Sequence, residues 1–148
     1  MEYILLLTAC INPDGMPFTC LADVGVRKKQ YIEALNFYLK NTTRKIVFVE
    51  NSGTDISSSF KDFQHRIEFL CFDGNLCFDK RKGKGYGEAL ILEYAMAKSE
   101  FITDDVLIFK LTGRLQLINI NRLIHYMDKL SPSKNFVCVV PPQNNSVD

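Results

Sequence analysis

Tyr3–Ala9, with the sequence YILLLTA, is a nearly continuous apolar run, which is typical of a strand buried on both faces of a sheet. A turn signal, Asn-Pro-Asp-Gly at residues 12–15, follows this run. Apolar residues then recur at helical spacing through Val26–Lys40, and Lys45–Glu50 (KIVFVE) repeats the buried-strand pattern. The order of strand, helix and strand predicts a parallel pair of strands joined by a crossover helix.

The same alternation continues along the rest of the chain. We expect a short helix at Ser57–Gln64, strands at Ile67–Phe72, Val106–Leu111 and Phe136–Val140, and helices at Tyr86–Lys98 and Asn121–Leu130. The helix at Tyr86–Lys98 is apolar almost all round, so we expect it to be well buried. The pattern predicts one Rossmann-like α/β domain over residues 1–148, with a mostly parallel sheet of four to five strands and helices on both faces.

The composition narrows the class of partner. Of the 148 residues, 47% are hydrophobic and 24% are charged, and the formal net charge is +1, so we expect no nucleic-acid partner. No apolar stretch has the length of a membrane span. The five cysteines show no CxxC spacing and the chain has only two histidines, so we expect no metal cluster. The odd number of cysteines, mostly in or beside apolar runs, favours reduced thiols in a cytoplasmic protein.

The stretch Phe78–Lys98 combines a basic, glycine-containing start with a helical pattern. Four cations alternate with glycines between residues 80 and 87, and Glu88 opens the periodic part. Glycine lets a backbone approach a ligand closely, and a helix N-terminus favours a bound phosphate. We interpret the basic cluster as one side of an anion site. The alternative is a solvated basic loop before an ordinary helix.

Charged residues and glycines gather in the loops that follow the predicted strands, where parallel sheets bind their ligands. The cations there are Lys84, Lys110 and Arg114, and the carboxylates are Glu50, Asp73 and Glu88. Lysine and arginine neutralise a diphosphate, and the planar fork of arginine can pair two phosphate oxygens at once. A carboxylate or amide after the second strand can bind a base or ribose edge. These residue types predict a site for a nucleotide diphosphate.

Several other kinds of site are excluded by missing motifs. The chain has no Walker A sequence, and the first strand is not followed by GxGxxG. No serine or cysteine lies in a nucleophile elbow, and neither His65 nor His125 lies in a predicted strand-end loop. We therefore expect no histidine-based acid–base chemistry.

The order of these segments resembles the nucleotide-sugar-binding half of a GT-A type glycosyltransferase. The motifs that carry the resemblance are the strand end Leu7–Cys10, the loop Glu50–Asp55, the glycine-opened helix Gly83–Ala95 and the KLTGR run Lys110–Arg114. The KLTGR run after a K-G-x-G-E helix is similar to a divergent group of bacterial transferases that build envelope polysaccharide and lack the D-x-D metal motif. The resemblance covers about Tyr3 to Ile120.

The resemblance implies roles for residues at the predicted site. Thr8, Ala9, Glu50 and Asn51 would hold the nucleoside, with Asp73, Gly85, Thr112 and Gly113 completing the binding set. The D-x-D motif is absent, and Asp104 and Asp105 come at the start of their strand, at the wrong end for the site. Our hypothesis is that Lys110, Arg114 and Lys84 carry the charge of the leaving diphosphate, with Glu88 as a further catalytic candidate. We expect no cofactor, although Mg²⁺ or Mn²⁺ stays open, and Arg114 could instead be a structural ion-pair partner.

The activity that follows from the resemblance is sugar transfer from a nucleotide-sugar donor to a glycan or lipid-linked acceptor of the bacterial envelope. The alternatives are a non-catalytic nucleotide-binding or partner-binding module and, third, a sugar-activating nucleotidyltransferase. Only about 34 residues follow Arg114, so we expect the acceptor half to be short or missing. A homodimer could cover the apolar surface that this would leave.

Overall fold

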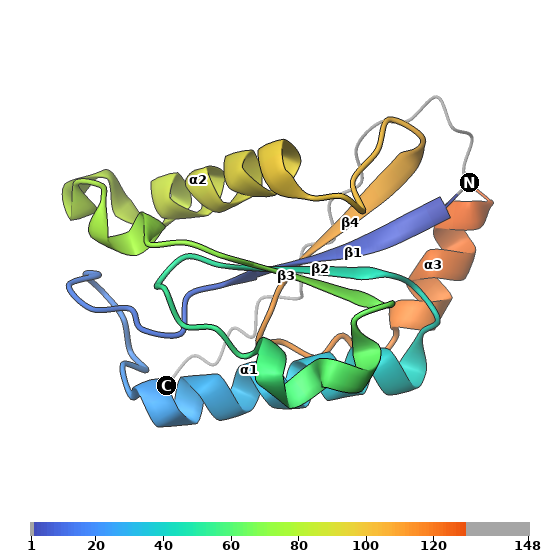
Figure 1. The fold of residues 1–148 in the computed structure, drawn as a ribbon, viewed down its shortest axis with the longest axis horizontal. Coiled ribbons are helices and arrows are strands. Elements are labelled where there is room, and N and C mark those ends of the chain that lie inside the picture. The colour runs from blue at the N-terminus through green and yellow to red at the C-terminus, as the bar shows by residue number, and fades with distance from the viewer. Residues whose placement is uncertain (1, 130–148) are drawn as a thin grey trace, which may run out of the picture.

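Four parallel strands form the sheet of the computed structural model, which describes residues 2–129. They are β1 (Glu2–Ala9), β2 (Ile46–Glu50), β3 (Ile67–Cys71) and β4 (Val106–Thr112), in the spatial order β3-β2-β1-β4 (Figure 1). β1 pairs along one edge with β2 and along the other with β4. The prediction of an α/β domain with a parallel sheet is therefore confirmed.

Helices cover both faces of this sheet (Figure 1). On one face lie α1 (Val24–Asn41), α3 (Ile120–Asp128) and the 3₁₀ segment η1 (Ser57–Phe63), which share one apolar cluster with the strands. On the other face lies α2 (Gly83–Lys98), preceded by two short 3₁₀ turns, η2 (Gly74–Leu76) and η3 (Lys80–Lys82). α1 and α2 lie on opposite faces because of the strand order. From β1 the chain adds β2 and β3 on one side of β1, and it then crosses back to add β4 on the other side. Right-handed crossovers that run in opposite directions across a sheet place their helices on opposite faces.

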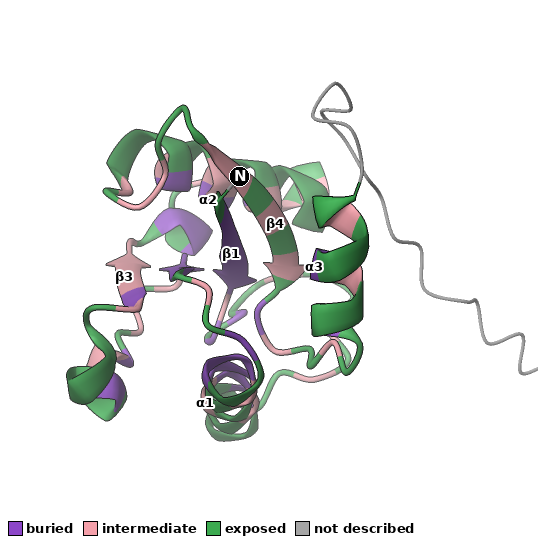
Figure 2. Cartoon of the chain, turned by 90° about the vertical axis from the view of Figure 1, so that its right-hand side faces the viewer, coloured by how far each residue is buried: buried purple, intermediate pink, exposed green. Residues whose placement is uncertain are grey.

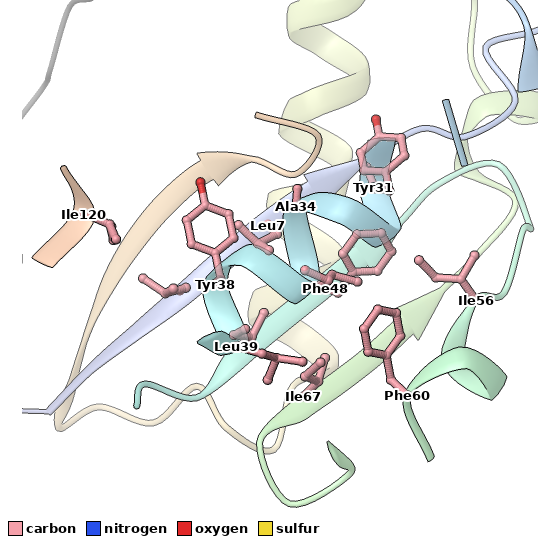
Figure 3. Close-up of a cluster of buried hydrophobic side chains, with 14 of the residues drawn as sticks. Leu7, Tyr31, Ala34, Tyr38, Leu39, Phe48, Ile56, Phe60, Ile67 and Ile120 are labelled. Atoms are coloured by element: carbon pink, nitrogen blue, oxygen red, sulfur yellow. The ribbon is translucent and has the colours of Figure 1, made fainter. Parts of the chain in front are cut away.

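The larger core cluster lies between the sheet and α1 (Figure 3). Alternate residues of β1, including Leu5 and Leu7, point to this side and are completely buried. Tyr31 and Tyr38 come from the predicted apolar stripe of α1, and Tyr31 meets Phe48 of β2 edge to face, with 5.8 Å between ring centroids. The central strands are buried almost throughout (Figure 2). The prediction that the apolar runs form strands buried on both faces of the sheet is therefore confirmed.

The expectation that the helix near Tyr86–Lys98 is well buried is wrong. α2 begins earlier, at Gly83, and only Gly87, Ile91 and Ala95 are buried in it. Those residues form one stripe against β1 and β2, while the apolar side chain of Met96 is 58% exposed. The reason is that α2 is the one α-helix over this face among the described residues, so the side of α2 that carries Met96 stays exposed.

The remaining differences concern element boundaries. η1 is a 3₁₀ segment with a kink at Phe60 rather than a regular helix, and β3 ends one residue before the predicted end. The predicted strand at Phe136–Val140 and the predicted helix end at Leu130 lie outside the described residues. Within residues 2–129, no helix has the length and apolar character that a membrane crossing needs.

The core around Phe48 yields a stability prediction. Phe48 is 1% exposed and contacts α1, whereas Phe63 is 37% exposed. Phe48→Ala leaves a cavity under α1 and should lower the free energy of unfolding by about 3–5 kcal/mol in a urea titration. Phe63→Ala is the matched control and should cost less than about 1 kcal/mol. Equal losses for the two variants would contradict the assignment of the core.

Candidate functional site

A pocket of about 420 Å³ opens at the carboxyl edge of the sheet, beside the ends of β1 and β4. The chain leaves β1 for α1 on one face and reaches β4 through α2 on the other. This is the point where the strand order reverses, and open parallel sheets bind ligands in the crevice that such a reversal creates. The predicted site residues that line the pocket are Thr8, Ala9, Asn51, Lys84, Glu88, Thr112 and Arg114.

The floor of the pocket depends on a close approach between the ends of β1 and β4. The backbone N–H of Gly113 donates to the carbonyl oxygen of Thr8 at 2.8 Å. A Cβ atom at position 113 would lie 2.8 Å from that same oxygen, so any larger residue would push the strands apart. Gly113 therefore serves the packing of the strands and does not line the pocket.

Arg27 is the residue of this pocket that sequence reasoning missed. It is 7% exposed, and its Nε donates to the Cys10 carbonyl oxygen and its Nη1 to the Leu21 carbonyl oxygen, each at 3.0 Å, while its Nη2 also donates to the Cys10 oxygen. Among residues 2–129, no carboxylate lies within 4 Å of it, so a buried full charge is bound to neutral oxygens alone. The signal was present in the sequence, because Arg27 stands one helical turn before Tyr31 on the apolar stripe of α1.

Two further cations reach the pocket from other elements. Arg114, just after β4, donates to the side-chain oxygen of Gln30 at 3.4 Å. Lys84, in the first turn of α2, donates to the carbonyl oxygen of Phe18. Within the described chain neither has a carboxylate within 4 Å, so the alternative of an ion pair for Arg114 finds no partner there. Three unpaired cations therefore converge on the pocket from α1, α2 and the end of β4.

Lys110 does not line the pocket but forms an ion pair with Glu88 across its edge. The Thr8 hydroxyl donates to the same Glu88 carboxylate at 3.1 Å. The side chains of Lys110 and Glu88 are 36% and 41% exposed, so the pair lies at the surface. Glu88 is thus held in place by β1 and β4 together, and the charge of Lys110 is directed to Glu88 rather than to the pocket.

Glu50, predicted as a nucleoside ligand, instead binds the protein's own backbone. It is 1% exposed, and its carboxylate accepts from the N–H groups of Ile11 at 2.8 Å and of Ser52 and Thr54, each at 2.9 Å. The Ser52 hydroxyl donates to it as well. These four donors and the Cys71 thiol, at 3.6 Å, satisfy the buried charge, which joins the loop after β1 to the loop after β2.

Asn51 has an unused acceptor at the pocket. The residue is 3% exposed, and its backbone N–H donates to the Ala9 carbonyl at 3.1 Å. Its side-chain oxygen is buried and accepts no hydrogen bond from the described residues. An unsatisfied buried acceptor is costly, so a donor group of a ligand would find a prepared partner here.

The structure separates two other predicted residues from the pocket. Asp73 lies over Gly53, where a Cβ atom would come 2.2 Å from its Oδ1, and it lines a different groove. Gly85 does not line the pocket either. Of the basic cluster around the start of α2, Lys84 lines the pocket but Lys80 and Arg81 do not. Lys80 donates to the Asp14 carbonyl at 2.9 Å, and Arg81 pairs with Asp79 at 2.8 Å.

Two of the thiols near the site, Cys10 and Cys71, are held protonated. Burial, together with the negative charge of Glu50, raises the pKa of Cys10 to about 11 and that of Cys71 to about 12. Neither thiol is a thiolate at neutral pH, so neither is a nucleophile there. No group of three or more His, Cys, Asp or Glu side chains within residues 2–129 is arranged to hold a metal ion.

The hydrogen bonds of Glu50 lead to a prediction about the pocket loops. Glu50→Gln keeps the shape but turns one acceptor into a donor that faces backbone N–H groups. We expect a loss of about 2–4 kcal/mol in the free energy of unfolding and faster hydrogen exchange at the amides of Ile11, Ser52 and Thr54. Glu33→Gln on the exposed side of α1 is the control and should change the stability by less than about 0.5 kcal/mol. Unchanged protection of the Ile11 amide would contradict this role.

Comparison of the chain with protein-family models, with curated proteins and with solved structures finds no match.

Proposed function

We propose that this chain binds a nucleoside-diphosphate sugar in the pocket at the ends of β1 and β4 and transfers the sugar to a glycan or lipid-linked acceptor of the bacterial envelope. The observation that carries the proposal is the buried guanidinium of Arg27, which lines this pocket without a counter-ion among residues 2–129. A buried charge is stable when it is paired, and a bound anion supplies the missing partner. The resemblance to GT-A transferases supports a nucleotide sugar as the source of that anion.

The cations around the pocket suit a diphosphate in number and type. Arg114 can pair two phosphate oxygens and Lys84 adds a compact charge, while Arg27, whose three nitrogens already donate to carbonyl oxygens, contributes its buried positive charge. The start of α2 supports the same assignment. Its N-cap residue, Lys82, forms no side-chain cap and its first turn has no acidic residue, so the positive end of the helix dipole is not neutralised there, although the Gly83 N–H already donates to the Lys80 carbonyl oxygen. We assign the diphosphate to Arg27, Arg114 and Lys84, and no longer to Lys110.

The nucleoside would lie toward the end of β2. The unsatisfied side-chain oxygen of Asn51 can accept a hydrogen bond from a base N–H or a ribose hydroxyl. Thr8 and Ala9 line the same part of the pocket. A volume of about 420 Å³ lies within the usual range of small-molecule sites. We therefore propose Thr8, Ala9 and Asn51 as nucleoside contacts and no longer Glu50, whose carboxylate binds backbone N–H groups.

In the transfer step, the bond between the sugar C1 and the diphosphate oxygen breaks, and the electron pair stays on the leaving diphosphate. The acceptor hydroxyl forms the new bond to C1 and gives its proton to a base. Glu88 is the carboxylate among the described residues that line the pocket, and we assign the proton to it. The three cations stabilise the charge that develops on the diphosphate.

The GT-A resemblance also implies Mg²⁺ or Mn²⁺, and the donor set does not fit either ion. Glu88 offers one carboxylate to the pocket, and that carboxylate already pairs with Lys110. These hard cations need several oxygen ligands. We therefore propose that the cationic side chains take the place of the ion and that transfer proceeds in EDTA.

Binding is tested first, by thermal-shift and calorimetric titration with UDP, GDP, CDP, dTDP and ADP in EDTA. One of them should bind, and Arg114→Gln and Lys84→Gln should each weaken that binding about ten- to a hundredfold, because each removes a charge-assisted contact worth about 1.5–3 kcal/mol. Lys82→Gln removes the same charge two residues from Lys84 but outside the pocket lining, and its affinity should stay within about twofold. Failure of every nucleotide to bind, or an equal loss in the Lys82 variant, would overturn the assignment.

Turnover is tested separately, by release of the nucleoside diphosphate from its nucleotide sugar. Glu88→Gln should lower the rate constant about a hundredfold or more while the dissociation constant of the nucleotide stays within about threefold, because the change removes the base but not the cations. Binding without any release of the diphosphate by the unaltered protein would favour the non-catalytic nucleotide-binding module. Activity that disappears in EDTA and returns with Mn²⁺ would contradict the metal-independent step.

A further inference from the structure

We propose that a second groove, on another flank of α2, is a binding site for a small alkylammonium cation. The groove has a volume of about 510 Å³ and lies between α2 and the segment that follows β3. It shares no lining residue with the pocket at the ends of β1 and β4. The proposal is therefore independent of the nucleotide-sugar assignment.

Four aromatic rings form much of the wall of this groove. Phe72 and Tyr94 are stacked, with 4.1 Å between centroids and an interplanar angle of 10°, and Phe78 and Tyr86 are tilted at 5.6 Å. The faces of such rings carry negative charge density and attract cations. Two of these rings already attract cations of the chain itself, and the nearer is the Lys82 ammonium, 4.4 Å from the centroid of Tyr86.

Two carboxylates complete the wall. Asp73 and Glu93 both line the groove and are exposed, and neither has a cation within 4 Å among residues 2–129. Lys82 at Tyr86 and Lys80, 5.7 Å from the centroid of Phe78, are the ammonium groups recorded over these rings. Within the lining itself there is no lysine or arginine, so the described wall is negative and aromatic.

The hydrogen-bonding character of the wall favours a cation over a sugar. A sugar hydroxyl both donates and accepts, and so needs donors in its site. Apart from the two tyrosine hydroxyls, the described side chains of this groove offer no N–H or O–H donor except the weak thiol of Cys77. An ammonium group only donates or, when fully methylated, only presents positive charge. The volume is that of a small-molecule site, which favours a free ammonium compound over a peptide segment.

The test compares two probes of the same shape and different charge. Choline carries a quaternary ammonium group, and 3,3-dimethylbutan-1-ol has a carbon atom in place of the nitrogen. Calorimetric or NMR titration should show saturable binding of choline and at least about tenfold weaker binding of the alcohol, because ring faces and carboxylates attract only the charged probe. Raising the salt concentration from low to high should weaken choline binding severalfold.

Variants place the binding in the groove. Tyr86→Leu and Glu93→Gln should each weaken choline binding about three- to tenfold, and Lys82→Gln should strengthen it, since that change removes the ammonium already lying over Tyr86. The controls are Tyr126→Leu and Glu100→Gln, which make the same chemical changes at exposed positions outside the groove and should have no effect.

Three results of the probe titrations would overturn the proposal: equal affinity for the two probes, tighter binding of a neutral oligosaccharide than of choline, or no saturable binding of choline to the folded protein. Each is distinct from failure of the proposed function, because nucleotide binding is measured at the other flank of α2 with Arg114→Gln and Lys84→Gln, and Lys82→Gln serves there only as a control with no expected effect. Retention of choline binding in Tyr86→Leu and Glu93→Gln would likewise place the cation elsewhere and contradict the site.

Discussion

β1 is the constraint on which the other described elements depend, because it is hydrogen-bonded along both edges and buried on both faces. Its pairing with β2 and β4 fixes where those strands end, and its two faces determine where α1 and α2 can pack. The end of this strand also forms the floor of the pocket, through the contact of Thr8 with Gly113. The site is therefore built on the most buried part of the molecule, which holds its side chains in a defined geometry.

Two buried charged side chains near the end of β1, Glu50 and Arg27, differ in the partners that surround them. Glu50 is surrounded by backbone N–H groups and a hydroxyl, and its full hydrogen bonding joins two loops. Arg27 is buried to a similar degree but contacts neutral carbonyl oxygens. Because the free energy of a buried ion depends on its partners, the first arrangement is complete within the described chain and the second favours an external anion. This contrast separates a structural charge from a binding charge at the same edge of the sheet.

α2 connects the two proposed binding regions. Its buried stripe packs on β1 and β2, one flank carries Lys84 and Glu88 into the pocket, and another carries Tyr86 and Glu93 into the aromatic groove. Its partial exposure is what makes this arrangement available, since a fully buried helix would present no free flank. Gly87 allows close packing as well, because a Cβ atom there would lie 3.0 Å from the ring of Phe78.

The sequence by itself determined the fold class and the edge of the sheet where the pocket lies. Apolar runs such as Tyr3–Ala9 and the stripe of α1 are local patterns, and local patterns decide strands, helices and their order. What only the tertiary structure decided is the partner of each charged side chain. Glu50 and Arg27 could not be told apart as structural or free charges from their positions in the chain, because their neighbours come from distant segments. The burial of α2 was misjudged for the same reason, since the number of elements covering a face is a property of the assembled sheet and not of the helix sequence.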